Sequence, residues 1–374
     1  MIYSCGTDNI SSNMIKVLIV EDSLVTRQHL KHLLERDGTI QVIGMAEDGM
    51  GAISFLQENT PDVITMDINM PGMNGLDATR RIMETAPLPI VIVSASYNRN
   101  DVEMTFRAIE AGAVAIIEKP FGKGHPDHEA MSDTLIRTVM LMSEVKVIKR
   151  RPKKLSSSAI SHPIPSHIKH ETVHNNIKII TIGASTGGPL VIRTILSGLR
   201  KGFPAPLMIV QHIASGFLKG LVDWLIETTE HPVHIAVDGE RMLPGHAYLA
   251  PDNFHMGVER DGRIVLSKSA PENGVRPSVS YLFRSASDVF GKDMAGVLLT
   301  GMGCDGAKEL KLMKDRGAVT IAQDKKSSVV FGMPGEAVKL GGARHILPPD
   351  AISATLEYYL HSAAKRRSKH DEES

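Results

Sequence analysis

The chain has 374 residues, and its 42 Lys+Arg and 42 Asp+Glu residues give a formal net charge of zero. This length predicts two or three domains. The balanced charge argues against a dedicated nucleic-acid-binding protein, which usually carries a basic domain. The two cysteines, Cys5 and Cys304, lie far apart in the sequence, which excludes a disulfide framework and is typical of a reducing cytoplasm.

The two ends of the chain are expected to lie outside the folded domains. Residues 1–13 lack the basic start and apolar core of a signal peptide, so we expect a disordered extension with Met14 as an alternative start. Residues 366–374 are expected to form a polar tail. No apolar run is long enough to cross a bilayer, so we expect a cytoplasmic monomer without membrane insertion.

Between residues 14 and 148, short apolar runs alternate with helix-like stretches over 24–35, 51–58 and 128–148. This alternation predicts an α/β domain with a doubly wound parallel sheet. Ligands bind such sheets at the carboxyl ends of the strands. The expected strands are Val17–Val20, Val42–Gly44, Val63–Met66, Ile90–Val93 and Ala113–Ile117.

Charged and hydroxyl side chains follow four of these runs. Glu21 and Asp22 follow the first run and Asp67 follows the third. Two like charges ~4 Å apart repel by ~4 kcal/mol at an effective dielectric of about 20, and a divalent cation would relieve this. An oxygen-only, open ligand set suits Mg²⁺. Ser94 and Lys119, after the fourth and fifth runs, are suited to holding a phosphoryl group. Any one of these residues alone would be read as a solvated loop residue.

The segments that carry these side chains resemble a response-regulator receiver domain, which has a flavodoxin-like fold. The resemblance covers nearly all of residues 14–142. It implies that Asp67 is the phosphorylated residue and that a CheA-type histidine kinase is the donor. The matching segments are Val17–Ser23, Met66–Gly75, Ser94–Ala95 and Glu118–Pro120.

The same resemblance assigns further roles at this site. Mg²⁺ would be held by Glu21, Asp22, Asp67 and the backbone carbonyl of Asn69. The phosphoryl group would be contacted by Ser94 and Lys119. Receivers often have an aromatic switch residue three positions before the lysine, but Ile116 stands there in this chain, which argues against a switch by aromatic rotation.

Residues 149–176 read as a linker between two domains. The segment begins with the basic run Lys149–Lys154 and continues with Ser, Pro and His residues without apolar periodicity. A solvated hinge is favoured over a nucleic-acid or acidic-partner contact. A metal site is disfavoured because the spacing of its histidines is irregular. These histidines are His162, His167, His170 and His174.

In the second domain, expected over 177–365, a glycine-rich corner follows the first apolar run. The run Ile177–Ile182 leads into Gly183–Gly187, and helix-like spacing begins near Leu190. Small neighbours let the backbone turn sharply and leave Ser185 exposed beside the free N–H groups of a helix start. This position suits a nucleophile, although a serine that only caps the helix would show the same local pattern.

Two more apolar runs of this domain also end in a polar residue with catalytic potential. Leu207–Val210 is followed by His212, and Ala295–Thr300 is followed by Asp305. Strand ends of one parallel sheet share an edge, so a serine, a base and an orienting carboxylate can meet there. Taken singly, the histidine could be structural and the aspartate could cap a helix near residue 307.

Two other interpretations of this half are weaker. A dinucleotide site is disfavoured because the glycine spacing is not GxGxxG and no acidic residue lies between Gly183 and Val222. A cysteine nucleophile is disfavoured because Asp305 directly follows Cys304 and would oppose the thiolate. The Ser–His–Asp order also differs from the order of the α/β-hydrolase fold.

The second half resembles the catalytic domain of chemotaxis methylesterases, the CheB family, over residues 177–359. This resemblance implies that Ser185 is the nucleophile, His212 the base and Asp305 its orienting partner, with the N–H of Met302 in the oxyanion hole. Arg276 is a candidate for the substrate cleft. The matching segments are Thr181–Pro189, Val210–Ile213, Tyr248–Pro251, Arg276–Val279 and Leu299–Gly306.

Together the two resemblances imply two doubly wound parallel-sheet domains, a receiver followed by a methylesterase. From residue chemistry alone we reach only serine-based acyl transfer to water. The resemblance adds demethylation of glutamyl methyl esters and deamidation of glutamines on methyl-accepting receptors, gated by phosphorylation and without a cofactor for hydrolysis. A second domain that only binds protein or nucleic acid is the competing hypothesis.

Overall fold

The computed structural model describes residues 14–36, 38–95, 99–147 and 177–372. The chain divides into two compact units, residues 1–156 and 157–374. The predicted N-terminal extension and linker lie outside the described residues, as do residues 373–374 of the predicted tail. Residues 366–372 of that tail form the end of a helix. No helix within the described ranges has the length and apolar character needed to span a membrane.

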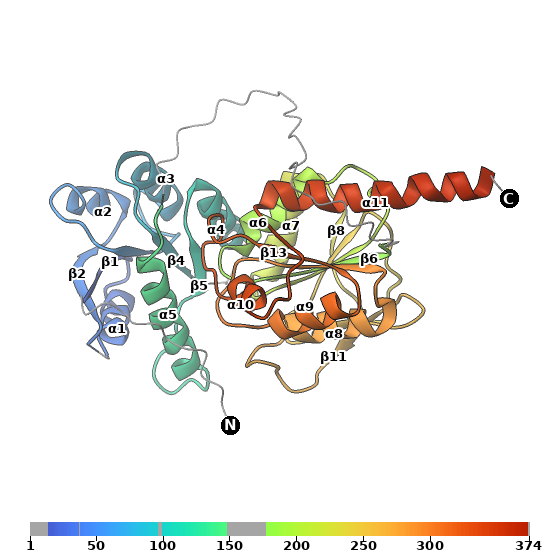
Figure 1. The fold of residues 1–374 in the computed structure, drawn as a ribbon. Helices are drawn as coiled ribbons and strands as arrows, with labels where there is room; N and C mark the ends of the chain where they lie inside the picture. Colours follow the sequence, from blue (N-terminus) through green and yellow to red (C-terminus); the bar gives the residue numbers. More distant parts are fainter. Residues whose placement is uncertain (1–13, 37, 96–98, 148–176, 373–374) are drawn as a thin grey trace. The chain divides into compact units, whose positions relative to one another are not determined.

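The N-terminal unit contains a five-stranded parallel sheet in the order β2-β1-β3-β4-β5. This is the flavodoxin-like strand order, and it confirms the predicted receiver fold. Helices α1 and α5 cover one face of the sheet, and α2, α3 and α4 cover the other (Figure 1). The elements are β1 (Ile15–Val20), α1 (Leu24–Leu34), β2 (Ile40–Ala46), α2 (Gly49–Phe55), β3 (Val63–Met66), α3 (Gly75–Thr85), β4 (Ile90–Ser94), α4 (Arg99–Ala111), β5 (Ala115–Glu118) and α5 (His128–Ser143).

Local capping sets where several of these helices begin. The side chain of Ser23 accepts from Thr26 N before α1, and that of Asp48 accepts from Gly51 N before α2. Because Asp48 provides this cap, α2 begins two residues before the expected start at 51. Helix α5 ends before the expected residue 148, because Val145 N already bonds three residues back to Met142 O in a tighter closing turn.

The C-terminal unit contains a seven-stranded sheet, also parallel, in the order β14-β13-β12-β6-β7-β9-β8. Helices α6, α7 and α11 cover one face, and α8, α9 and α10 cover the other (Figure 1). Strands β10 and β11 form a separate antiparallel pair. The elements are β6 (Ile179–Ala184), α6 (Gly188–Gly198), β7 (Leu207–Gln211), α7 (Leu218–Thr229), β8 (Val233–Ile235), β9 (Ala247–Leu249), β10 (His255–Val258), β11 (Ile264–Ser267), α8 (Val279–Phe290), β12 (Met294–Leu298), α9 (Ala307–Asp315), β13 (Val319–Gln323), α10 (Met333–Lys339), β14 (His345–Leu347) and α11 (Pro349–Glu372).

The three apolar runs identified in the sequence of this unit become β6, β7 and β12, which lie next to one another. Every residue of these strands is buried, as expected for strands covered by helices on both faces. After β6 the chain continues to β7 on one side, and after β12 it continues to β13 on the other. The carboxyl ends of β6 and β12 therefore flank a topological switch point, where α/β proteins bind ligands.

Val279, the first residue of α8, packs where β6 and the loop after β12 approach. A Cβ atom on Gly183 would lie 2.3 Å from Val279 Cγ1, and one on Gly306 would lie 2.4 Å from it. Gly306 also has a φ of 83°, a left-handed conformation that favours glycine. The two glycines thus let the beginning of α8 lie against the edge where the strands end.

The substitution Gly183→Ala tests this packing. We expect it to lower the free energy of unfolding of the C-terminal unit by about 1–3 kcal/mol, because the added methyl group overlaps Val279. Denaturant unfolding followed by Trp224 fluorescence reports this unit, since Trp224 in α7 is the chain's only tryptophan. In the Gly183→Ala background, Val279→Ala should recover part of the loss, and an additive loss would contradict this account.

Candidate active site

Ser185 and His212 lie next to each other at the ends of paired strands. In the parallel register of β6 and β7, Ala184 pairs with Gln211, so the two side chains occupy the next position of each strand. The backbone N–H of His212 donates to Ala184 O at 2.9 Å. The structure therefore brings these two predicted residues to the same edge of the sheet.

The side chain of Gln211 links the two loops that leave these strands. Its Nε2 donates to Ser185 O and to His212 O, both at 2.8 Å. A Cβ atom on Gly188 would lie 2.1 Å from Gln211 Oε1, so only glycine fits beside this amide. Sequence reasoning missed the role of Gln211, and its only signal was its place just before the histidine.

The end of β12 is joined to the same corner through Thr300. Ser185 N donates to Thr300 O at 3.0 Å, and the Thr300 hydroxyl donates to Thr186 O at 2.9 Å. These bonds hold the backbone of the serine turn between its two neighbouring strands. Ser185 itself is half-buried.

Asp305, in the loop after β12, contacts His212 directly. The distance from His212 Nε2 to Asp305 Oδ2 is 3.0 Å, and both side chains are largely buried. Since the carboxylate can only accept, Nε2 carries the proton and Nδ1 is left for a second partner. Within the described residues, no hydrogen bond joins the Ser185 hydroxyl to His212, so the serine is beside the imidazole but not bonded to it.

The Asp305 carboxylate lies at the N-terminus of α8, not at that of its own helix α9. Burial raises the pKa of a carboxyl group, but the hydrogen bond and charge of His212 and the N–H of Val279 hold the pKa of Asp305 well below its usual range. The group therefore stays ionised at neutral pH. Its hydrogen-bond donors besides His212 are Asn273 Nδ2 (2.8 Å), Ser278 Oγ (2.8 Å), Val279 N (2.6 Å) and Ser280 N (3.1 Å).

Sequence reasoning missed three side chains of this surrounding, Asn273, Ser278 and Ser280. Two signals were present: Ser278 caps α8 by accepting from Tyr281 N, and Asn273-Gly274 is a dipeptide typical of tight turns. The sequence did not reveal that the turn and the cap meet at Asp305.

Met302 and Arg276 lie on loops near these residues. A Cβ atom on Gly301 would lie 2.6 Å from Ser185 Cβ, so the peptide that precedes Met302 lies against the serine. Among the described residues, the N–H of Met302 donates to no other group. Arg276 Nη1 donates to Lys268 O and Ser269 O, both at 3.0 Å, and closes its own loop.

In the N-terminal unit, Glu21, Asp22 and Asp67 gather at the carboxyl edge of the sheet. One carboxylate oxygen of each lies within 4.8 Å of the others, with Glu21 and Asp67 buried and Asp22 exposed. Lys119 Nζ lies 2.8 Å from both Glu21 Oε2 and Asp67 Oδ2. Among the described side chains, Lys119 is the only positive charge paired with these carboxylates, whereas Arg27 Nη1 donates to the backbone carbonyl of Glu21 at 2.5 Å.

Burial dominates the electrostatics of this cluster. It raises the pKa of Glu21 and of Asp67 above their usual values, although Lys119 acts in the opposite direction. Burial would lower the pKa of Lys119, but the charges of Asp67 and Glu21 raise it above its usual value. Glu21 and Asp67 resist ionisation even beside Lys119, so an additional positive charge would stabilise their ionised forms. Oxygen-only ligands of this kind suit Mg²⁺. The residues fit such an ion.

The remaining predicted residues of this unit have distinct positions. Asn69 is exposed two residues after Asp67, whereas Ser94 is buried at the end of β4. Ser94 O accepts from Lys119 N at 3.1 Å, and its hydroxyl faces Ala95 O, not Asp67. Ile116 lies half-buried in β5.

Comparisons with known proteins agree with this architecture. The family profile for the CheB methylesterase matches residues 180–356, and that for the response regulator receiver domain matches residues 17–126. The chain is 55% identical over 344 residues to a Geobacter metallireducens protein named protein-glutamate methylesterase/protein-glutamine glutaminase 4, covering 92% of this chain and 98% of that protein. It is 52% identical over 343 residues to the protein-glutamate methylesterase/protein-glutamine glutaminase of Nitrosospira multiformis, covering 92% and 96%. The crystal structure of the Thermotoga maritima CheB methylesterase catalytic domain is 42% identical, with a TM-score of 0.47, and covers 48% of this chain and 97% of that one.

The protein is thus a two-domain response regulator, a receiver followed by an α/β output domain. Within this class, the chain belongs to the CheB methylesterase family, as the relatives that match almost their whole length show.

Competition between protons and Mg²⁺ for the carboxylates of the acidic cluster can be tested directly. Metal ligands must be deprotonated to bind, and the pKa values of Glu21 and Asp67 are raised, so protonation begins at a higher pH than for ordinary carboxyls. We expect Mg²⁺ affinity, measured by calorimetry on the full chain, to weaken as the pH is lowered, and to begin weakening at a higher pH than it would with ordinary carboxyl groups. Glu21→Gln should flatten this dependence, and an affinity that does not change with pH would contradict it.

Proposed function

We propose that the chain is a phosphorylation-gated serine hydrolase that demethylates glutamyl methyl esters and deamidates glutamines on methyl-accepting chemotaxis receptors. The observation that carries this proposal is the arrangement of Ser185, His212 and Asp305 at three adjacent strand ends, with His212 bonded to a buried carboxylate. The relatives named protein-glutamate methylesterase/protein-glutamine glutaminase support the reaction.

In this mechanism His212 is the base and Ser185 the nucleophile. Because Nε2 is bonded to Asp305, the proton of the serine hydroxyl passes to Nδ1 as Oγ attacks the side-chain carbonyl. The protonated imidazole then donates to the leaving group, which departs as methanol from an ester or ammonia from an amide. Water attacks the acyl-enzyme with His212 again as base, which breaks the ester bond to Ser185 Oγ and leaves a glutamate side chain on the receptor.

Two groups stabilise the charges that develop. Asp305 is ionised before the reaction and stabilises the imidazolium that forms on His212. The backbone N–H of Met302, which lacks an acceptor among the described residues, donates to the oxyanion of the tetrahedral intermediate. In this mechanism Ser185, His212, Asp305 and water account for every bond change and proton transfer. We therefore propose no cofactor for the hydrolase.

For the receiver, we propose that a CheA-type histidine kinase phosphorylates Asp67. Glu21, Asp22, Asp67 and the carbonyl of Asn69 would hold Mg²⁺, which would supply positive charge to offset that of the phosphoryl group. Ser94 and Lys119 would contact that group afterwards, and phosphorylation would release the hydrolase from inhibition by the receiver. The acidic cluster and the receiver profile support this assignment. We place the enzyme in the cytoplasm and expect a monomer.

The substitution Ser185→Ala tests the nucleophile. We expect methanol release from methylated receptor to fall by roughly 10⁴-fold or more. The unfolding midpoint should not change, because within the described residues the serine hydroxyl makes no hydrogen bond. Cys304→Ala, on a neighbouring loop, is the matched control and should retain activity. Loss of activity in the control but not in Ser185→Ala would assign the nucleophile to the cysteine.

The substitution Asp67→Asn tests the gate. Because the amide cannot accept a phosphoryl group, we expect basal methanol release to persist and its stimulation by acetyl phosphate to disappear. The control is Asp77→Asn, which removes only surface contacts to Arg80 and Asn74 and should leave stimulation unchanged. Stimulation that survives in Asp67→Asn would place the phosphorylated residue elsewhere.

A further inference from the structure

The segment before α8 contains a tight turn that points one side chain at Asp305. Glu272 and Val275 exchange two backbone hydrogen bonds, of 3.1 and 3.0 Å. The central residues, Asn273 and Gly274, have φ values of 53° and 79°. Positive φ at both central positions is the type I′ pattern, for which Asn-Gly is the preferred dipeptide. The turn lies at the surface, with Asn273 exposed.

The amide of Asn273 donates one hydrogen to the Asp305 carboxylate and the other to the Ser280 hydroxyl. Nδ2 lies 2.8 Å from Asp305 Oδ1 and 3.1 Å from Ser280 Oγ. The ionised carboxylate only accepts, so the nitrogen and not the oxygen of the amide must face it. The same Ser280 hydroxyl donates to Glu309 Oε2 at 2.7 Å and accepts from Gly306 N at 2.9 Å.

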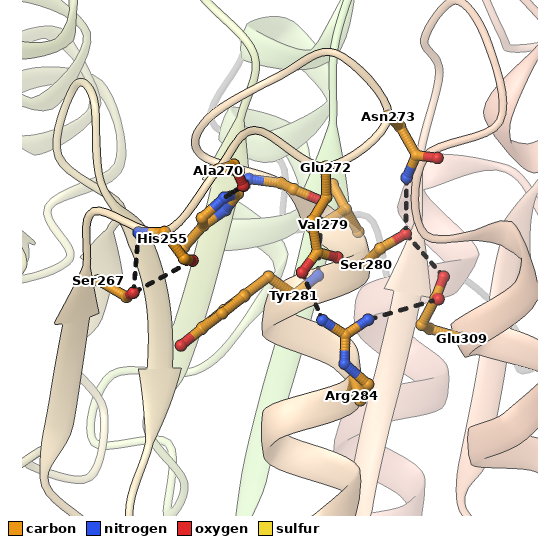
Figure 2. A network of polar contacts seen from close by, with 12 residues as sticks. His255, Ser267, Ala270, Glu272, Asn273, Val279, Ser280, Tyr281, Arg284 and Glu309 are labelled. Carbon is orange, nitrogen blue, oxygen red and sulfur yellow. Dashed lines mark hydrogen bonds and ion pairs between the residues drawn. The ribbon is translucent and has the colours of Figure 1, made fainter. Parts of the chain in front are cut away.

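The loop that carries this turn is bonded to α8 through Glu272 and to β10 through Ala270, as Figure 2 shows. On one side, Arg284 Nη2 in α8 pairs with Glu272 Oε1 at 2.5 Å. On the other side, the buried ring of His255 accepts from Ser278 N at Nδ1, so its Nε2 donates to Ala270 O at 3.0 Å. The ring also stacks on Tyr281, with centroids 4.8 Å apart. The amide is therefore held in place by the fold.

We propose that Asn273 is a positioning residue of the hydrolytic site, acting on His212 through Asp305. Its amide covers the solvent side of Oδ1 and fixes the rotation of the carboxylate, so that Oδ2 remains aimed at the imidazole. This inference rests on the proposed function. A turn with no role beyond linking β11 to α8 would need the Asn-Gly backbone but not the amide.

The charges around the carboxylate determine what a substitution should do. His212 contacts Asp305 directly. Glu309 is further away, because it accepts from the Ser280 hydroxyl, and Arg284 lies beyond it, paired with Glu309. Asn273→Gly keeps the turn and removes the amide. Asn273→Asp also keeps the turn, since aspartate tolerates positive φ, but it replaces a donor by a negative charge that stabilises the imidazolium form of His212.

The experiment measures methanol release from methylated receptor by the full chain across pH. We expect Asn273→Gly to lower kcat about tenfold with little change in KM, because a charge-assisted hydrogen bond is lost while substrate contacts remain. Asn273→Asp should lower kcat by about 100-fold and move the acid limb of kcat/KM upward by about one pH unit.

Asn253 provides the matched control, because it too has a positive φ, of 62°, and is not among the residues bonded to Asp305. Its Gly and Asp variants should show wild-type kcat and an unmoved acid limb. Equal losses in both Asn273 variants without a shift of the acid limb, or wild-type behaviour of Asn273→Asp, would overturn the inference. An inactive wild-type enzyme would instead refute the proposed function.

Discussion

The arrangement of the C-terminal unit depends on one buried carboxylate. Asp305 is removed from water, where an ion loses several kcal/mol of solvation, and it remains charged because donors surround it. Two of these are backbone N–H groups at the start of α8, where the helix dipole also favours an anion. The helix must therefore begin at the strand edge, and Gly183 and Gly306 provide the space for Val279 there. The same bonds leave Oδ2 directed at His212, which sets the tautomer of the imidazole.

The backbone around the serine is held with similar precision. Gln211 bonds the carbonyls of Ser185 and His212, and Thr300 bonds both residues of the serine turn. Each contact joins loops from different strands, so the three strand ends behave as one unit. Groups that are positioned before substrate arrives need no reorganisation during the reaction, which is the main advantage of a rigid site. The Ser185 hydroxyl, which has no partner among the described residues, remains free to rotate.

The two units place acidic residues at equivalent positions, beyond the carboxyl ends of parallel strands, but with opposite electrostatics. Around Asp305, hydrogen bonds outweigh burial and the pKa is lowered. Around Asp67 and Glu21, burial outweighs the single Lys119, and both pKa values are raised. At the first site, the hydrogen-bond donors, His212 among them, keep Asp305 ionised, so the site holds its anion without a further positive charge. At the second site the ionised carboxylates would be stabilised by further positive charge, which agrees with the magnesium and phosphorylation site that we propose there.

The sequence by itself determined the fold class of both units, because continuous apolar runs followed by helical periodicity predict buried parallel strands. It also brought Ser185, His212 and Asp305 into consideration, since each follows such a run. It could not determine that β12, β6 and β7 are neighbours, because strand order depends on how the crossovers pack. Nor could it identify Asn273 as a partner of Asp305, 32 residues away. Hydrogen bonds between distant loops leave no periodic trace in a sequence, and only the tertiary structure decided which donors reach the carboxylate.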